Sequence, residues 1–558
     1  MDGLCNCGSE QNAAAADGGR VLLLGLDGAT FTLLDKWIER GLMPNLRRLV
    51  TEGTRATLRS VIPPVTGPAW VSFSTGVHPG KHGIFDFRKR VPDRPERQLI
   101  SALDVQAPTL WEMLAEAGLP VGLINLPVTY PPSDLTSFHL TDMLTPRSAA
   151  SFCHPPSLYE ELRPTLGEYI IDVPEGIVKG PRGMERYLEA LGECTRQRTR
   201  YAEHLLRTRP WKVATVVYVG PDRIQHPLWD VLTEEYAIFR RTAETLRVKE
   251  LAERYVTLLD ECVGRVVAAV PADTDVLVVS DHGFGRLRRR LKINQWLARH
   301  KLLVPSRRRG RVGRLLVAAD VLRLRQRLGV MLVRLRGKVP ADWQRPFWRW
   351  INWSKTRAYA PSVTEMGAYV NLQGREVYGS VPPEQYEQVR DEIIACLREL
   401  RDPATGKPML TIAARREEVF RGEHSEQAPD VVFLLQDGEC TMDVRLEGPL
   451  FEPASWSAWT GMHRFEGILI ARGPRIRAGA PLAQVGIVDI APTVLRLCGL
   501  AAPSHMDGRS LTELLTEEVL EPTQVVKESV VSRPAADDLY SEEETREVEA
   551  RLRDLGYL

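Results

Sequence analysis

Residue types that bind divalent metal ions occur in four segments that lie far apart along this sequence. They are Asp27 in "LLGLDGAT", Asp222 and His226 in "VGPDRIQH", Asp281 and His282 in "VSDHGFG", and His463 in "GMHRFEGILI". Carboxylate and imidazole ligands suit zinc, manganese or iron, whereas magnesium and calcium prefer oxygen ligands alone. Each motif is a weak signal by itself. Together, at the ends of apolar runs in one chain, they predict a centre that holds two metal ions.

A hydroxyl-rich stretch could supply such a centre with a nucleophile. The run "SVIPPVTGPAWVSFSTG" at 60–76 carries Thr66, Ser72, Ser74 and Thr75. The hydroxyl of serine or threonine is a poor nucleophile at neutral pH, and a bound metal ion can hold it as the alkoxide. The residues alone leave two interpretations open: one hydroxyl is the nucleophile, or all four are ordinary polar residues of a loop.

The elements that must position these residues follow an alternating pattern. Short aliphatic runs of the kind that form buried parallel strands occur in "RVLLLGL", "WKVATVVYVG", "DVLVVS" and "GILIAR". Apolar residues at helical spacing occur between them, as in "TLLDKWIERGLMPNLRRLVTEG". Strands that alternate with helices predict an α/β fold with a mainly parallel sheet covered on both faces. In such sheets ligands bind at the carboxyl ends of the strands, which is where the metal-binding residue types stand.

The composition is that of an ordinary globular protein. The 558 residues are 44% hydrophobic and 26% charged, and the net charge near +1 supports neither nucleic-acid nor membrane binding by the whole protein. The eight cysteines are scattered and predict no disulfide framework, and Cys5 and Cys7 lack further ligands for a zinc site. Residues 1–19 show no signal-peptide pattern, so we expect a cytoplasmic protein without a transmembrane segment.

Two regions stand apart from this pattern. Residues 286–338 are dense in arginine, with apolar residues at helical spacing. They fit either a basic amphipathic helix that contacts an anionic membrane surface or acidic substrate, or a helical hairpin with solvated arginines. The stretch "YSEEETREVEARLRDLGYL" has acids first and bases later, as the helix dipole favours, and predicts a docked helix.

We expect five regions along the chain. They are a flexible tail at 1–19, the first part of the core at 20–295, an Arg-rich helical insertion at 296–350, the second part of the core at 351–515 with a small α+β excursion at about 368–436, and a linker with a C-terminal helix at 516–558.

These motifs resemble those of the alkaline phosphatase superfamily, and within it the type I phosphodiesterase/nucleotide pyrophosphatase branch. The resemblance runs from about residue 20 to 515 and is weakest across the Arg-rich region. Besides the four metal-binding segments it rests on "PPVTGPAWVSFSTGVHPGKHGIFDF" and "VGIVDIAPTVLRLCGLAAPSHMDGRSL". It implies a three-layer α/β/α core with a mainly parallel sheet, and metal-dependent hydrolysis of phosphoric esters.

The resemblance also implies a role for each candidate residue. The metal ion that activates the nucleophile would be held by Asp27, Thr66, Asp281 and His282, and the second ion by Asp222, His226 and His463. Both would be zinc, with manganese or iron as alternatives. Thr66 would be the nucleophile, whereas Ser72, Ser74 and Thr75 fall where a helix should begin and would cap or pack it.

The implied reaction has two steps. Thr66 attacks phosphorus to form a phospho-threonine ester, which water on the second metal ion hydrolyses. Nucleotide pyrophosphatases follow the nucleophile with Phe-Pro-Asn, whose Asn donates to a phosphoryl oxygen. This chain has Gly67, Pro68 and Ala69 there, so the donor would be the backbone N–H of Gly67 or an arginine of the insertion.

The expected partner is a small-molecule phosphate ester, with a nucleotide or a lipid headgroup as candidates, and no sequence-specific nucleic acid. Alternative activities are those of a phosphomonoesterase, a phosphonate hydrolase or a phosphomutase. A non-catalytic module that binds anions or a membrane surface is the alternative outside enzymes. The full set of seven candidate ligands argues against that last alternative.

Overall fold

The computed structural model describes residues 19–557, apart from 92–95, 150, 174–179, 235–241, 307–349, 455–458 and several positions between 518 and 538. Most of the Arg-rich insertion and the Cys5–Cys7 pair therefore lie outside the described residues. The chain forms two compact units. Unit 1 takes the described residues of Met1–Phe87, Leu99–Arg286 and Ser455–Tyr557, and unit 2 those of Arg88–Gln98 and Leu287–Ala454.

A sheet lies at the centre of unit 1. In the described part of the chain it has nine strands, which are β1 (Val21–Leu26), β2 (Thr54–Arg59), β5 (Val121–Ile124), β6 (Phe138–Leu140), β7 (Cys153–His154), β8 (Val213–Tyr218), β9 (Asp275–Val279), β19 (Glu466–Arg472) and β20 (Val485–Gly486). Their order is β20-β2-β19-β9-β1-β8-β5-β6-β7. Strand β1 runs parallel to β8 and β9, β5 runs parallel to β8 and β6, and β19 is antiparallel to β9 and β2. The predicted α/β fold with a mainly parallel sheet is confirmed.

The central strands are buried along their whole length because they are apolar on both faces. Every residue of β1, β8 and β9 is buried. Alternate side chains of β1 enter two different cores: Leu22, Leu24 and Leu26 pack in one, and Val21 and Leu23 in the other. This division is what a sheet covered by helices on both faces requires, since successive side chains of a strand point to opposite faces.

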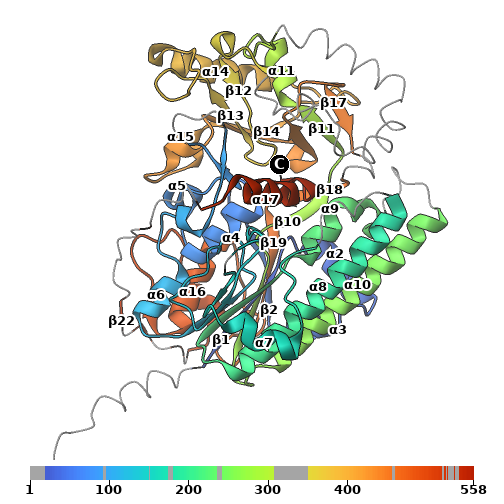
Figure 1. The fold of residues 1–558 in the computed structure, drawn as a ribbon, viewed down its shortest axis with the longest axis vertical. Coiled ribbons are helices and arrows are strands. Elements are labelled where there is room, and N and C mark those ends of the chain that lie inside the picture. Colours follow the sequence, from blue (N-terminus) through green and yellow to red (C-terminus); the bar gives the residue numbers. More distant parts are fainter. Residues whose placement is uncertain are drawn as a thin grey trace, which may run out of the picture. The chain divides into compact units, whose positions relative to one another are not determined.

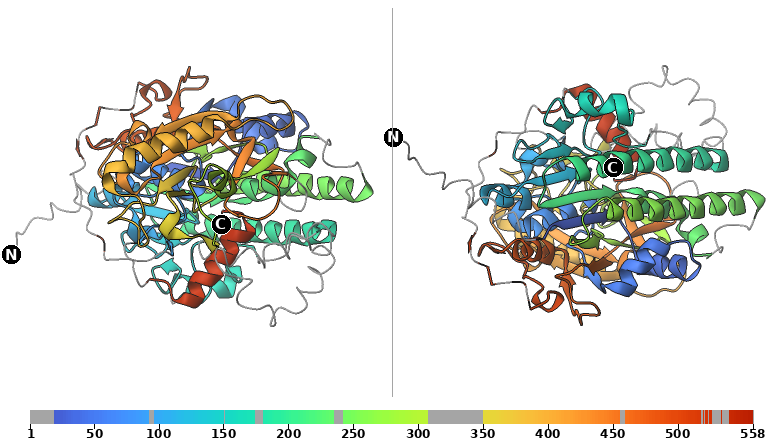
Figure 2. Two further views of the ribbon diagram at one scale, coloured as in Figure 1. Left: turned by 90° about the horizontal axis from the view of Figure 1, so that it is seen from above. Right: turned by 90° about the horizontal axis from the view of Figure 1, so that it is seen from below.

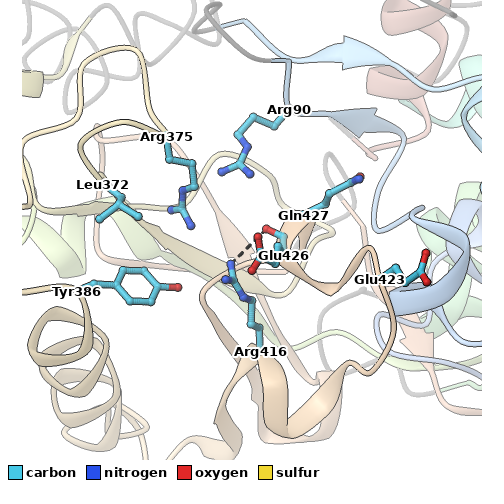
Figure 3. A pocket seen from close by; sticks show the side chains of 8 residues that line it. All are labelled: Arg90, Leu372, Arg375, Tyr386, Arg416, Glu423, Glu426 and Gln427. Atoms are coloured by element: carbon cyan, nitrogen blue, oxygen red, sulfur yellow. Dashed lines mark hydrogen bonds between the residues drawn. The ribbon is translucent and has the colours of Figure 1, made fainter. Parts of the chain in front are cut away.

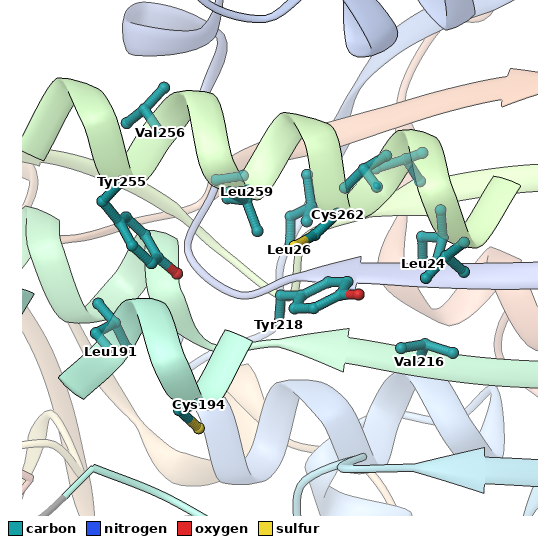
Figure 4. Packing of buried hydrophobic residues seen from close by; sticks show 14 of the residues in the cluster. Leu24, Leu26, Leu191, Cys194, Val216, Tyr218, Tyr255, Val256, Leu259 and Cys262 are labelled. Atoms are coloured by element: carbon teal, nitrogen blue, oxygen red, sulfur yellow. The ribbon is translucent and has the colours of Figure 1, made fainter. Parts of the chain in front are cut away.

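Helices cover each face of this sheet (Figures 1 and 2). One face packs against α2 (Phe31–Glu39), α3 (Pro44–Glu52), α8 (Gly180–Thr208), α9 (Gly220–Leu232) and α10 (Ala243–Ala268), and the other against α4 (Thr66–Thr75), α6 (Leu110–Glu116) and α16 (Ile490–Leu497). Figure 4 shows the first of these cores, in which Leu191 of α8, Leu259 of α10 and Tyr218 of β8 belong to one cluster of buried residues. Unit 1 is therefore a three-layer α/β/α sandwich.

Helix α4 begins earlier than the sequence predicts. Its first residue is Thr66, whereas the proline-rich run predicts a helix that starts near Ser72. The hydroxyls of Ser74 and Thr75 donate to the carbonyls of Trp70 and Val71, one turn back in the same helix, at 2.8 Å each. They pack inside α4 and do not cap it. The prolines do not delay the helix, because proline is tolerated in a first turn, where N–H groups have no intrahelical acceptor.

Further short elements complete unit 1. They are α5 (Pro79–His82), α7 (Leu158–Leu166), β10 (Gly283–Arg286), β18 (Gly461–Arg464), β21 (Leu500–Ala501), β22 (Gln524–Val525) and α17 (Glu542–Asp554). Strands β10 and β18 pair antiparallel, with Phe284 opposite His463. Ser541 caps α17, and glutamates fill its first turn, as the charge pattern of this stretch predicts.

Unit 2 has a sheet and a hydrophobic core of its own. Its sheet elements are β11 (Arg289–Lys292), β12 (Ala358–Tyr359), β13 (Gly367–Val370), β14 (Leu410–Arg415), β15 (Val431–Leu435), β16 (Cys440–Asp443) and β17 (Phe451–Pro453). Beside them lie α11 (Ile293–Arg299), α14 (Tyr386–Arg398), α15 (Arg416–Val419) and the two-residue strands β3 (Arg88–Lys89) and β4 (Gln98–Leu99). Tyr369, Ile393 and Phe433 lie in its core. Among the helices of the described residues, none combines the length and apolar character needed to cross a bilayer.

Candidate active site

All seven predicted metal ligands lie in unit 1, and five of them follow the carboxyl ends of strands of its central sheet. Asp27 follows β1, Asp281 and His282 follow β9, and Asp222 and His226 stand on α9, which follows β8. Because β1, β8 and β9 are parallel neighbours, their carboxyl ends meet at one edge of the sheet. The other two ligands arrive from elsewhere: Thr66 opens α4, and His463 lies in β18.

The first group of side chains is formed by Asp27, Asp281 and His282. Atom Nε2 of His282 lies 3.3 Å from Oδ2 of Asp281 and 3.7 Å from Oδ1 of Asp27. The hydroxyl oxygen of Thr66 is 3.4 Å from the same Nε2. One nitrogen and two carboxylate oxygens within 4.8 Å of one another make a pocket of ligand atoms that suits a divalent metal ion.

The second group is formed by Asp222, His226 and His463. Atom Oδ1 of Asp222 lies 3.2 Å from Nε2 of His226 and 3.3 Å from Nε2 of His463, and the two nitrogens are 3.1 Å apart. The rings of His463 and His282 stack with their centroids 3.7 Å apart, so the two groups are neighbours. The structure thus assembles the same two sets of residues that the resemblance implies.

Each histidine of the site is oriented by a hydrogen bond from its other ring nitrogen. The Nδ1–H groups of His226, His282 and His463 donate to backbone carbonyls, which belong to Gly461, Gly283 and Pro64 at 3.3, 3.0 and 2.9 Å. A carbonyl can only accept, so Nδ1 carries the proton and Nε2 presents its lone pair to the carboxylates. Metal-binding histidines are held in the same way, which fixes their tautomer and ring orientation.

Each carboxylate of the site accepts hydrogen bonds at one oxygen and leaves its other oxygen without a donor among the described residues. Asp27 Oδ2 accepts from Trp70 Nε1 at 3.1 Å, and Asp281 Oδ1 accepts from the N–H of Gly28 at 3.1 Å. The remaining oxygens, Oδ1 of Asp27, Oδ2 of Asp281 and Oδ1 of Asp222, are buried and accept no hydrogen bond from any described residue. A buried carboxylate oxygen without a partner is costly. Divalent cations would satisfy all three oxygens, so the residues present fit a metal-binding role.

Burial also sets the protonation of these groups. It raises the pKa of Asp27 well above the usual range, with the nearby charge of Asp281 adding to the effect, and it raises the pKa of Asp281 to about 8. Burial lowers the pKa of His282 well below its usual range and also lowers that of His463. The imidazoles of His282 and His463 are therefore neutral, which is the form that binds metal ions.

A substitution at Trp70 tests whether its hydrogen bond to Asp27 positions this carboxylate for metal binding. Replacing Trp70 by Phe removes the N–H that orients Asp27 and keeps an aromatic ring in the core. We expect Zn²⁺ binding to weaken by about 10- to 100-fold, the usual effect of losing such a supporting contact. Calorimetric titration of the metal-free protein measures this affinity. The matched control is Trp37→Phe, a buried tryptophan of the core on the α2 face, which should leave it unchanged. Unchanged affinity in Trp70→Phe would show that this bond does not orient Asp27.

Three residues at the site escaped prediction from the sequence. Trp70 lies one helical turn after Thr66, and the spacing alone does not indicate its contact with Asp27. Arg223 is buried 3.4 Å from Asp222 and 3.0 Å from Asp172, and its place beside Asp222 in the motif was the available signal. Tyr557 reaches Thr66 across 491 positions of sequence, for which no local pattern exists.

Unit 2 contains a separate cavity of about 480 Å³, shown in Figure 3. Its described lining residues are Arg90, Leu372, Arg375, Tyr386, Arg416, Glu423, Glu426 and Gln427. The three guanidinium groups are already paired: Arg375 and Arg416 with Asp430 at 2.6 and 3.0 Å, and Arg90 with Glu376 at 3.0 Å. Each of the three guanidinium groups therefore already has a carboxylate partner within unit 2.

The fold and the site together define the class of protein. The three-layer α/β/α core, with two groups of candidate metal ligands near one edge of its sheet, is the arrangement that the resemblance to the alkaline phosphatase superfamily implies. The family model for type I phosphodiesterase/nucleotide pyrophosphatase matches residues 21–445. The chain belongs to this family, as its motifs predict, and family membership identifies it as a phosphoester hydrolase.

Several solved structures are similar to this chain. Phosphonoacetate hydrolase from Sinorhizobium meliloti 1021, in complex with phosphonoacetate, is 16% identical with a TM-score of 0.49, covering 86% of this chain and 96% of that one. Human ectonucleotide pyrophosphatase/phosphodiesterase 5 is 14% identical with a TM-score of 0.47, covering 89% and 100%. An inactive variant of its murine counterpart with AMP is 13% identical with a TM-score of 0.48, covering 89% and 100%. No curated protein matches the sequence significantly.

Proposed function

We propose that this protein is a two-metal phosphodiesterase or pyrophosphatase that acts through a covalent phospho-threonine formed at Thr66. The observation that carries the proposal is the position of the Thr66 hydroxyl beside the two groups of ligand atoms. It lies 3.4 Å from His282 Nε2, and the rings of His282 and His463 stack next to it. The carbonyl of Pro64, two residues before the nucleophile, also orients His463.

The two groups divide the metal ions between them. Asp27, Thr66, Asp281 and His282 would hold one ion, and Asp222, His226 and His463 would hold the other. Mixed carboxylate and imidazole ligands favour Zn²⁺, and Mn²⁺ or iron would suit the same residues. When bound, the ions supply positive charge that lowers the pKa of the threonine hydroxyl and offsets the charge of the phosphoryl oxygens.

The protein's own residues carry out the bond changes as follows. The Thr66 hydroxyl gives its proton to solvent water, its oxygen attacks phosphorus as the bond from phosphorus to the leaving oxygen breaks, and the leaving alkoxide takes a proton from water. Water then attacks the phospho-threonine, which releases the phosphoryl product and restores the Thr66 hydroxyl. The N–H of Gly67 lies in the first turn of α4, where it has no intrahelical acceptor, and it donates to a phosphoryl oxygen.

An assay of two model substrates tests this function. We expect faster hydrolysis of the diester bis-p-nitrophenyl phosphate than of the monoester p-nitrophenyl phosphate, and loss of both activities with a chelator. Family membership supports the diester preference. A preference for the monoester would make the protein a phosphomonoesterase. Stoichiometric metal without turnover of either ester would favour a non-catalytic anion-binding module.

The cysteines support a location in the cytoplasm. The described cysteines Cys153, Cys194, Cys262, Cys396, Cys440 and Cys498 are free thiols, and five of them are buried. Free thiols persist in reducing compartments, so we place the protein there. Contact of the Arg-rich insertion with an anionic membrane surface or a lipid headgroup stays a prediction from the sequence, because residues 307–349 lie outside the described part of the chain.

A further inference from the structure

A tyrosine from the segment after α17 touches the proposed nucleophile. The hydroxyl oxygen of Tyr557 lies 2.9 Å from the hydroxyl oxygen of Thr66 and 3.3 Å from Oδ2 of Asp222. Its side chain is buried, with 1% of the residue exposed. The phenol therefore bridges the nucleophile and a ligand of the second metal group, inside the site.

The helix before this tyrosine is firmly docked on unit 1. Val548 and Leu552 of α17 are completely buried. The guanidinium of Arg551 is also buried and donates to the carbonyls of Met143 and Thr145, at 2.5 and 2.9 Å. Buried hydrogen bonds from a charged donor are among the stronger ones in proteins. The position of Tyr557 therefore follows from a docked element of the fold.

The turn immediately before Tyr557 requires a glycine at position 556. Gly556 has a φ of +74°, and a Cβ on it would lie 1.4 Å from the ring of Trp459, so only glycine fits there. That tryptophan stacks on the imidazole of His226 with ring centroids 4.1 Å apart. The ring of Tyr557 packs on Phe87 with centroids 4.7 Å apart. The close approach of Gly556 to Trp459 and the packing of the phenol ring on Phe87 together position Tyr557 beside the ligand groups.

We propose that Tyr557 is a catalytic residue of this site, whose phenol O–H donates a hydrogen bond to the reacting oxygens at Thr66. The inference rests on the proposed function, since it takes Thr66 as the nucleophile. The residues that follow the nucleophile, Gly67, Pro68 and Ala69, carry no side-chain donor. A phenol within 2.9 Å of the nucleophilic oxygen also reaches the oxygens of a phosphoryl group bonded to it.

The chemistry of the phenol suits this role. Thr66 can donate to the Tyr557 oxygen while the Tyr557 O–H donates to Asp222, so the three groups form a chain in the substrate-free site. When the Thr66 oxygen loses its proton, rotation of the phenol O–H supplies a donor to the alkoxide and then to the phosphoryl oxygen. Hydrogen-bond donors within reach of developing negative charge contribute strongly to catalysis in buried sites.

The variant Tyr557→Phe tests the proposal, because it removes one oxygen and keeps the ring on Phe87. At saturating Zn²⁺, which offsets the loss of the Tyr557 hydrogen bond to Asp222, we expect kcat on bis-p-nitrophenyl phosphate to fall by about 10- to 1,000-fold, with KM and Tm close to those of the unaltered protein. Inhibition by orthovanadate, which resembles the transition state, should weaken in parallel. The matched control is Tyr540→Phe, whose hydroxyl donates to the carbonyl of Leu144, outside the site. It should keep kcat within about twofold.

Two results would overturn the role of Tyr557. A kcat for Tyr557→Phe equal to that of the unaltered protein would show that the phenol donates nothing in the reaction. A higher kcat, repeated in a chain truncated after Leu555, would show that the segment covers the site instead. Either result leaves the proposed function intact if Thr66→Ala is inactive. A metal-loaded protein without turnover would instead overturn the proposed function, and the role of Tyr557 with it.

Discussion

Replacement of Thr66 by Ala is expected to reduce turnover of phosphate diesters by at least about 10³-fold. The change removes the oxygen that forms the covalent ester, and losses of this size or larger follow when a nucleophile is deleted. Alanine keeps the start of α4 helical, and the methyl group fits in a position that is fully buried in the native chain. Steady-state kinetics and trapping of labelled phospho-enzyme at low pH measure the two consequences separately.

Two neighbouring hydroxyls give the matched controls for this experiment. Ser74→Ala removes a hydroxyl that donates to a carbonyl of the same helix, and we expect kcat within about twofold of the native value. Ser72→Ala removes a contact of 2.8 Å with His82 and should mainly lower the Tm. If Thr66→Ala kept its turnover while Ser72→Ala or Ser74→Ala lost it, the nucleophile would be the serine concerned.

Removal of metal ions is expected to abolish activity and also to lower the Tm. The metal-free protein buries three carboxylate oxygens that accept no hydrogen bond from the described residues, and bound cations stabilise the folded state by mass action.

Replacing one of these carboxylates by an amide should have the opposite effect, which is to raise the Tm of the metal-free protein. Asp281→Asn should raise the Tm of the metal-free protein, because it removes the cost of burying a carboxyl group whose pKa is raised to about 8 in the folded state. The same variant should bind fewer metal ions per chain and lose more than about 100-fold in kcat. Metal analysis and calorimetric melting measure both effects.

The matched control for Asp281 lies at the other end of the same strand. Asp275 is a buried carboxylate of β9 that pairs with Arg475 at 2.6 Å. Asp275→Asn breaks this pair and should lower the Tm, while metal content and kcat stay close to native values. A metal-free Asp281→Asn protein that melts below the metal-free native protein would contradict the idea that the site is strained without cations.

Much of this architecture is encoded in short stretches of sequence. The runs "VLLLGL", "VATVVY" and "DVLVV" are mostly aliphatic and too short for typical helices, so burial of both faces favours strands of a covered sheet. The polar residues that follow them, such as Asp27 and Asp281, must then meet at the carboxyl edge. The fold class and the candidate ligands were predictable because each depends on a local pattern of residue types.

The start of α4 shows where local patterns mislead. Prolines before and after Thr66 predict an extended loop, but the structure begins the helix at Thr66 itself. A proline in a first turn loses no hydrogen bond there, and packing of Trp70 and Phe73 into the core stabilises the helix that follows. Tertiary packing therefore decided an element boundary that propensity left undetermined.

The sequence by itself determined the central strands, the covering helices and the chemical types of the ligands, since these depend on residues close together in the chain. Only the tertiary structure decided how His282 and His463 stack and how Tyr557 comes to lie on Thr66. The physical reason is that such contacts join residues hundreds of positions apart. Their geometry is set by the packing of whole elements, such as α17 against the rest of unit 1. No spacing or periodicity within one short segment of sequence can indicate such a contact.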